Sequence, residues 1–264
     1  MKKTLVFLLL IFLFSSCYFN FKERMSGESE EAQTFLKTIE RNRAQTVRTE
    51  ITMNAGVLQV QGGSNDLVNA KIEYTREDWI PVISYATTND RGKLIIEQPG
   101  NGFKNINFGD DDTNRWDITL NEDVKQDIYM KVGAAATEVD LHGFRLNLFS
   151  LEAGVGEYDI DLSDTSVPEV DINAGVGEVN LNLTGKWKND LRAEINGGIG
   201  ELNLVLPADV GIHMEINGGL GSVDAPGFRK EGNIYTNEAY GNAKYVLDFE
   251  INGGMGDVNV SLVD

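Results

Sequence analysis

The residues with the greatest capacity for chemistry are carboxylates that recur at a nearly fixed spacing. Glu157, Glu178 and Glu201 each end a glycine-rich phrase, and Asp257 takes the same place in a later copy. If the copies stack, these side chains form a column of like charges, which is unfavourable by itself. A calcium ion would relieve the repulsion, because it takes oxygen ligands. Solvent, or carboxylates that cap backbone N–H groups, would give the column a purely structural role instead.

Other groups offer little support for catalysis. The chain has two histidines, His142 and His213, and one cysteine, Cys17. Their sequence context indicates neither a Ser-His-Asp triad nor a cluster of metal ligands. A pair of carboxylates can hydrolyse a glycosidic bond, but the repeat already accounts for the regular acidic positions. We therefore expect a protein that is not an enzyme and needs no cofactor.

Aromatic residues are the stronger binding candidates. One group lies near basic residues in a long insertion at about 225–245, namely Phe228, Tyr235, Tyr240 and Tyr245. Aromatic side chains beside cations suit contact with a carbohydrate or a protein. The alternative is an insertion that folds back, caps the repeats and buries these rings. Trp187, which stands between two lysines, is either a similar candidate on an exposed turn or a core residue.

A repeated phrase predicts the elements that position these side chains. Ala153-Gly154-Val155-Gly156-Glu157 returns four times in related form, with spacings of 21 to 23 residues and then one of 35. Alternating apolar and polar residues follow each copy, which is typical of strands. Val179, Leu181 and Leu183 should face inward and stack on Leu202, Leu204 and Leu206. The asparagines just before the glycines, Asn196, Asn217 and Asn252, tolerate left-handed conformations and can bond their own backbone. The predicted fold class is all-β: a β-solenoid (β-helix-like) of stacked glycine-punctuated rungs, about five or six in number, with an N-terminal β module.

The start of the chain predicts export. Two lysines precede an apolar stretch from Leu5 to Phe14, small serines follow, and Cys17 comes next. This order resembles a lipoprotein signal peptide at 1–16 with lipidation of Cys17; a plain secreted protein with an incidental cysteine is the alternative. The expected organisation continues with a polar tether at 17–46, an N-terminal β module at 47–127 and the β-solenoid repeats at 128–264. The expected location is the exported side of the cell membrane or the outer membrane.

Charge narrows the set of partners. The chain holds 41 acidic and 23 basic residues, which gives a net charge of −18. Nucleic acid is excluded as a partner, because its phosphates need a basic surface. The partners expected are the membrane, through the N-terminal lipid, and a protein or a glycan. A homodimer through the C-terminal edge is a further hypothesis, because the last strand, at Val258–Leu262, ends without a visible cap.

Several motifs together resemble one family. The N-terminal module contains Asn54–Val60 and Pro81–Tyr85, and the later part contains Trp116–Leu120, Leu141–Phe144 and the glycine repeats. Their order is similar to that of the bacterial toast-rack family of envelope proteins. The resemblance implies a solenoid-like β fold and an envelope setting, and it extends to cell-wall-antibiotic-response and adhesin-like β-repeat proteins. We expect a binding, scaffold or adhesin-like surface; the alternative is an accessory or sensor protein in cell-envelope stress signalling.

Overall fold

The structure, a computed structural model, describes residues 31–100 and 112–264. The predicted signal peptide and Cys17, the predicted site of lipidation, lie outside these residues. Residues 32–264 form one compact unit. Within the described ranges, no helix is long and apolar enough to cross a membrane.

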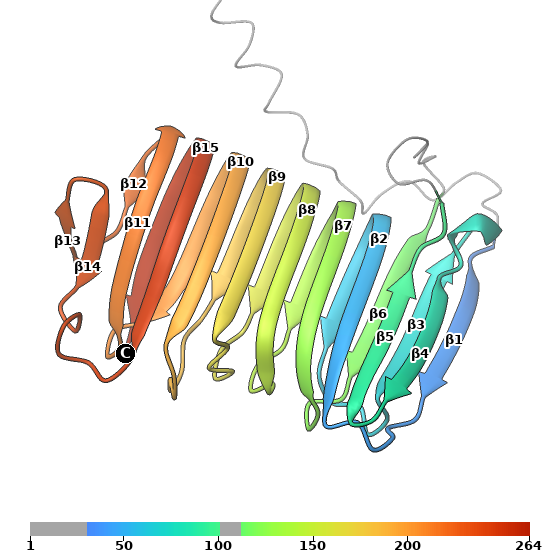
Figure 1. Cartoon of the computed structure of the whole chain (residues 1–264). Helices are drawn as coiled ribbons and strands as arrows, with labels where there is room; N and C mark the ends of the chain where they lie inside the picture. Colours follow the sequence, from blue (N-terminus) through green and yellow to red (C-terminus); the bar gives the residue numbers. More distant parts are fainter. Residues whose placement is uncertain (1–30, 101–111) are drawn as a thin grey trace, which may run out of the picture. The chain divides into compact units, whose positions relative to one another are not determined.

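The unit is built almost entirely of strands, which confirms the all-β prediction (Figure 1). A 3-10 turn, η1, covers Glu77–Trp79. The first strands are β1 (Gln33–Ile39), β2 (Thr46–Gln61), β3 (Val68–Tyr74), β4 (Val82–Thr88), β5 (Arg91–Glu97) and β6 (Asn114–Leu120). The long strands are β7 (Lys125–Asp140), β8 (Leu146–Asp161), β9 (Glu169–Asn182), β10 (Leu191–Pro207) and β15 (Val246–Val263). The remaining strands are β11 (Gly211–Leu220), β12 (Val223–Asp224), β13 (Phe228–Glu231) and β14 (Ile234–Asn237).

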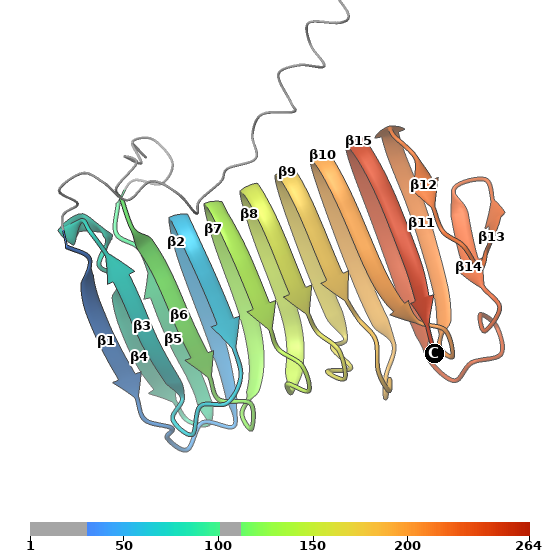
Figure 2. The same ribbon diagram turned by 180° about the vertical axis from the view of Figure 1, so that it is seen from behind.

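The long strands stack in parallel and in register. Their order along the sheet is β2, β7, β8, β9, β10, β15 and β11 (Figures 1 and 2). Val179 pairs with Leu202 and Leu181 with Leu204, and all four side chains are buried, as predicted. Leu183 and Leu206 are buried as well. Full burial of such a side chain contributes roughly 1.5–3 kcal/mol, so the repeated core is the main source of stability.

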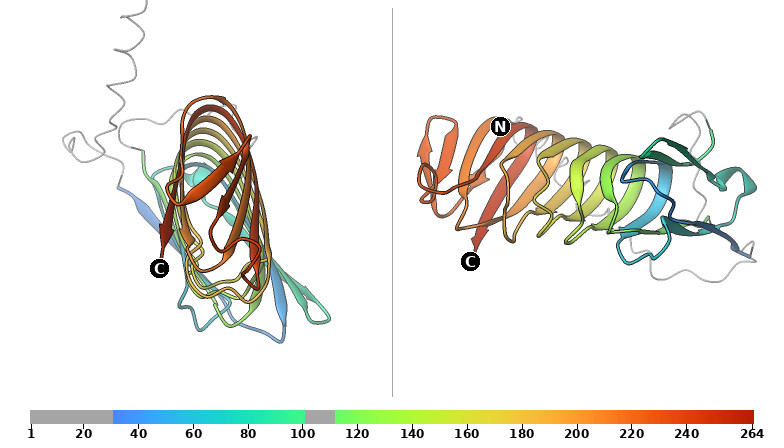
Figure 3. Two further views of the ribbon diagram at one scale, coloured as in Figure 1. Left: turned by 90° about the vertical axis from the view of Figure 1, so that its left-hand side faces the viewer. Right: turned by 60° about the horizontal axis from the view of Figure 1, so that its bottom comes forward.

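Each long strand turns over near its middle, so that the strands superimpose as flattened loops when viewed along the stack (Figure 3). The turn changes which residues face inward. In β8, Leu151 and Ala153 are buried before the turn, whereas Tyr158 and Ile160 are buried after it. In a regular strand, either the odd-numbered or the even-numbered residues would face inward along the whole length. Val155, at the turn, therefore faces solvent although its spacing from Ala153 would place it inside.

Glycine is required at the turn because neighbouring backbones nearly touch there. A Cβ atom on Gly154 would overlap the carbonyl oxygen of Gly133 in the preceding strand, and one on Gly156 would overlap that of Ala135. Gly177 and Gly200 have the same overlap and also have φ values of +137° and +151°. Contact between strands thus explains why the phrase repeats.

The N-terminal part is continuous with the stack. β2 pairs with β7 along nearly its whole length, so the parallel stack begins at Thr46 instead of near residue 128. The first half of β2 also pairs with β5, and its second half with β6. Residues 33–39 form β1, which pairs with β3, so the expected tether at 17–46 is wrong for this segment. Phe35 and Ile39 of this strand pack against the core. The apolar side chains in this mostly polar segment were too few to predict the strand from the sequence.

The C-terminal strand is an interior strand. On one side β15 pairs with β10, and on the other it pairs with β11 from Val246 to Met255 and with β12 at Val258 and Asn259. The predicted open edge at Val258–Leu262 is therefore paired at its first two residues, and the homodimer through this edge stays a prediction. The insertion forms the β13–β14 hairpin, and β14 pairs antiparallel with β11 beyond β15. The hairpin therefore lies at the end of the stack. The buried Asn237 ties it there, because it accepts the N–H of Ile212 at 2.9 Å and donates to the carbonyl of Val210 at 2.7 Å.

Candidate functional site

A row of exposed aliphatic side chains follows the turns of four adjacent strands. Val155 pairs with Val176, Val176 with Ile199, and Ile199 with Met255. Their exposed fractions are 57%, 44%, 49% and 49%. We call these four residues the apolar ridge. Neighbouring members are about 4.8 Å apart, the distance between paired strands. The tight glycine contacts hold the backbone beneath them, so the ridge is a fixed surface.

The predicted carboxylate column runs beside this ridge. Glu157 pairs with Glu178, Glu178 with Glu201, and Glu201 with Asp257. Asparagines of the adjacent strand bind two of them: Asn203 donates to Glu178 at 3.1 Å and Asn259 to Glu201 at 2.6 Å. These amide donors offset part of the repulsion between the carboxylates.

The column ends in a different contact. The hydroxyl and backbone N–H groups of Ser222 donate to Asp257 at 2.7 and 2.8 Å. These hydrogen bonds, the hydroxyl's first, hold the pKa of Asp257 below its ordinary value. As for the calcium hypothesis at Glu157, Glu178 and Glu201, no three metal-ligating side chains converge anywhere in the described ranges.

Hydrogen-bonded asparagines line the other side of the ridge. Asn196 donates to Asn173 at 2.9 Å, Asn252 to Asn196 at 3.0 Å, and Asn217 to Asn252 at 3.3 Å. Asn233, from the turn between β13 and β14, extends the row by donating to Asn217 at 2.8 Å. We call this row the asparagine ladder. The left-handed conformation that asparagine tolerates is not adopted at Asn196, Asn217 or Asn252: these residues lie in strands, and their amides bond one another along the stack.

The aromatic candidates do not form a common exposed surface. Trp187 is 8% exposed and donates to the carbonyl of Leu183 at 3.0 Å, so it is a core residue. Tyr235 is 5% exposed, and Phe228 and Tyr245 pack partly buried against the core. Tyr240 alone among the five is exposed, and its ring stacks on that of His213 with centroids 5.6 Å apart. The capping alternative therefore accounts for most of these rings.

The two histidines have separate partners. His142 Nδ1 lies 2.8 Å from the hydroxyl of Ser163, and His213 Nδ1 lies 2.6 Å from the carboxylate of Asp248. The two histidine rings therefore lie in different local contacts.

The apolar ridge was not predicted from the sequence, because the residue between the two glycines belongs to the turn phrase and the carboxylate that follows it is the more obvious candidate. One signal was available: Val155, Val176, Ile199 and Met255 are all large and aliphatic, although small or polar residues are the usual choice at a solvent-exposed turn.

Comparison with known proteins relates this chain to the toast-rack family and to a proposed cell adhesion protein of known structure. The model of the N-terminal domain of toast_rack (DUF2154) matches residues 27–177 and 150–205. The crystal structure of a proposed cell adhesion protein from Clostridium sporogenes ATCC 15579 is 31% identical, with a TM-score of 0.67, and the match covers 88% of this chain and 100% of that one. No curated protein matches the chain.

Two more distant structures are similar over the same share of this chain. A proposed adhesin from Bacteroides fragilis NCTC 9343 is 10% identical with a TM-score of 0.37, and 98% of that chain is covered. A proposed adhesin from Parabacteroides merdae ATCC 43184 is 11% identical with a TM-score of 0.25, and 96% of that chain is covered.

Proposed function

Because the chain belongs to the toast-rack family, we propose that it is a non-enzymatic, adhesin-like envelope protein whose stacked strands form a β-solenoid with a binding surface. In this proposal the chain is anchored on the exported side of a membrane by lipid on Cys17. The similarity to the Clostridium sporogenes protein, a proposed cell adhesion protein, supports the adhesin-like role.

The apolar ridge is the observation that carries the proposal. Aliphatic side chains that are about half exposed on four successive strands cost free energy in water, which contact with a partner would recover. The cost of ordering them is small, because the glycine contacts already fix the backbone. We infer that the partner is a protein rather than a glycan, since four of the five candidate aromatic rings that would stack on sugars are buried or partly buried.

Charge further defines this partner. The carboxylate column beside the ridge carries four acidic side chains, and only part of their charge is offset by asparagine amides. A protein surface with aliphatic residues beside lysines or arginines would match both rows. Electrostatic complementarity of this kind raises the association rate and selects among partners.

The test is crosslinking of the full-length chain in intact cells, followed by purification and mass spectrometry. The Val176→Thr/Ile199→Thr variant keeps strand propensity but makes the ridge polar. We expect it to lose a partner that the unaltered chain captures. The matched control is Val82→Thr/Val263→Thr, which changes two exposed aliphatic residues away from the ridge.

Each outcome has a distinct meaning. Loss of one reproducible partner only in the ridge variant supports the proposed surface, and a membrane signalling protein as that partner would indicate a regulatory role. Loss of a crosslink to a second copy of the chain would identify self-association. Equal capture by the ridge variant and the unaltered chain would contradict the proposal.

A further inference from the structure

A cavity of about 420 Å³ lies where the first strands of the stack begin. Four cationic side chains line it, Arg41, Arg43, Lys125 and Arg145, together with a single carboxylate, Asp123. The lining therefore has a positive balance of charge, although the whole chain has a net charge of −18. Local charge reversal of this kind attracts anions to one place on an otherwise repulsive surface.

The topology explains how these cations meet. Arg43 precedes β2, Lys125 is the first residue of β7, and Arg145 directly precedes β8. β2, β7 and β8 are parallel neighbours, so their starts lie side by side. Three segments that are separate in the sequence thus contribute positive groups to the same cavity: Arg41 and Arg43 come from the first, Lys125 from the second and Arg145 from the third.

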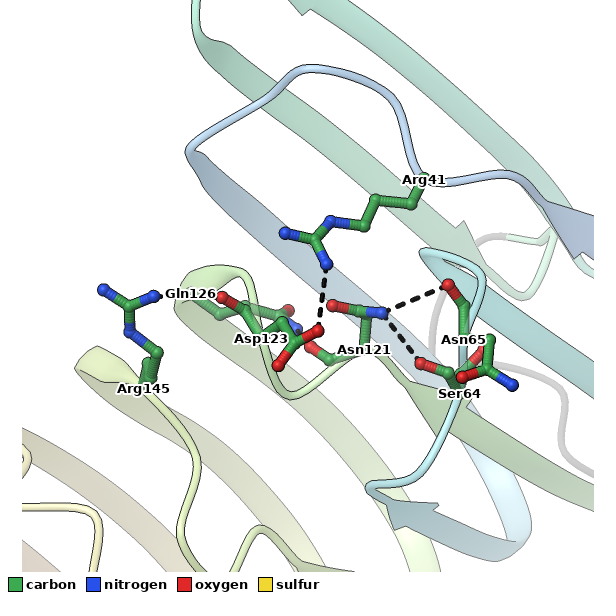
Figure 4. A network of polar contacts seen from close by, with 7 residues as sticks. All are labelled: Arg41, Ser64, Asn65, Asn121, Asp123, Gln126 and Arg145. Atoms are coloured by element: carbon green, nitrogen blue, oxygen red, sulfur yellow. Dashed lines mark hydrogen bonds and ion pairs between the residues drawn. The ribbon is translucent and has the colours of Figure 1, made fainter.

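Asp123 positions two of the guanidinium groups. Its carboxylate accepts Arg41 Nη1 at 3.0 Å, and its backbone carbonyl accepts Arg145 Nη1 at 3.2 Å (Figure 4). Arg43 and Lys125 form no ion pair with another residue of the described ranges. The cavity therefore offers two oriented cations and two without a charged partner.

Buried hydrogen bonds fix the loop that carries Asp123. Asn121 donates to the carbonyl oxygens of Ser64 and Asn65 at 2.8 and 3.3 Å (Figure 4). Gln126 donates to the carbonyl of Asn121 at 2.8 Å and accepts the hydroxyl of Thr49 at 2.8 Å. The loop that orients Arg41 and Arg145 is thus fixed before a ligand arrives, which lowers the entropic cost of binding at these two groups.

We propose that this cavity binds a phosphate ester. Guanidinium groups match the paired oxygens of a phosphate, and charge-assisted hydrogen bonds are about twice as strong as neutral ones. A cavity of about 420 Å³ also has room for a small polar body attached to the phosphate. A soluble ester and the headgroup of a phospholipid share this chemistry.

The test is calorimetric titration of the full chain, in neutral detergent micelles at low salt, with sn-glycerol 3-phosphate. We expect saturable binding, and roughly tenfold or greater weakening in Arg43→Ala/Lys125→Ala, since a hydrogen bond to a charged group is worth about 1.5–3 kcal/mol. Lys186→Ala/Lys188→Ala removes the same charge from an exposed turn elsewhere and should bind like the unaltered chain. Thermal unfolding checks that each variant is folded.

Repeating the titration with phosphatidylglycerol in the micelles distinguishes the two sources. If phosphatidylglycerol weakens the binding of glycerol phosphate, the cavity binds a lipid headgroup. If the lipid leaves that binding unchanged, the cavity binds a soluble ester. Failure of glycerol phosphate to saturate the chain in neutral micelles would overturn the proposal. Equal weakening in the Lys186/Lys188 control would overturn it as well, because binding would then depend on overall charge alone.

Discussion

At the scale of single residues, glycine decides how closely the strands can stack at the turn. Adjacent glycines in one strand differ sharply: a Cβ on Gly198 would overlap the carbonyl oxygen of Gly175, whereas a Cβ on Gly197 would meet nothing within 4 Å. Gly197 pairs with Ala174 of β9, which in turn pairs with Ala153 of β8, so alanine already occupies this place in two strands. Only one glycine of each pair is therefore required by the packing of the backbone.

We predict that Gly198→Ala destabilises the fold by about 2–4 kcal/mol, because the overlap must be relieved by separating two strands. Gly197→Ala should change the free energy of unfolding by no more than about 1 kcal/mol, and in the stabilising direction, since alanine restricts the unfolded chain. Urea unfolding followed by circular dichroism measures both. Similar losses in the two variants would show that strand contact does not fix the glycine pattern.

At the scale of elements, polar ladders join strands that the core also joins. Each interior member of the asparagine ladder donates to one neighbour and accepts from the next, as Asn196 does with Asn173 and Asn252. The ladder runs alongside the parallel strands and adds side-chain hydrogen bonds to those of the backbone. It therefore helps to hold β9, β10, β15 and β11 in register, and the first three of these strands carry residues of the apolar ridge.

We predict that Asn196→Ala lowers the free energy of unfolding by about 1–2 kcal/mol, because two neighbouring amides of a half-buried row lose their partner. Asn233→Ala, at the exposed end of the same ladder, should cost less, about 0.5 kcal/mol, since water replaces the lost contacts. Urea unfolding of both variants gives the comparison. An equal cost at the two positions would mean that the ladder adds nothing beyond single hydrogen bonds.

At the scale of the whole unit, the order of strands in space differs from their order in the chain. β15 is the last strand in the sequence but lies between β10 and β11. Its buried residues, among them Leu247, Phe249 and Ile251, complete the core under both neighbours. The end of the stack can therefore form only after the C-terminal strand has taken its place.

This order predicts the effect of truncation. A chain that ends at Tyr245 lacks β15, and we expect β11 and β14 to lose most of their protection from hydrogen exchange, whereas β8 and β9 keep theirs because repeats contact only their neighbours. A chain that ends at Leu262 removes only two exposed residues and should behave like the full chain. Protected amides in β11 of the shorter chain would show that β11 can pair directly with β10.

The sequence by itself determined the local features of this protein. Alternation and glycine spacing were enough to predict β structure, the inward stacking of Val179 and Leu181 on their partners, and the column of Glu157, Glu178 and Glu201. Each of these features repeats along the chain and follows from the period of a strand. The same regularity was enough to suggest the toast-rack family.

Only the tertiary structure decided the features that depend on long-range pairing. The interior place of β15, the strand at 33–39 and the burial of Trp187 and Tyr235 follow from which core surfaces meet, and no local pattern records that choice. The apolar ridge arises because the turn in each strand changes which alternate residues face inward, and this places Val155 on the outside. The cationic cavity assembles because parallel strands start at one edge, where Arg43, Lys125 and Arg145 become neighbours despite their distance in the sequence.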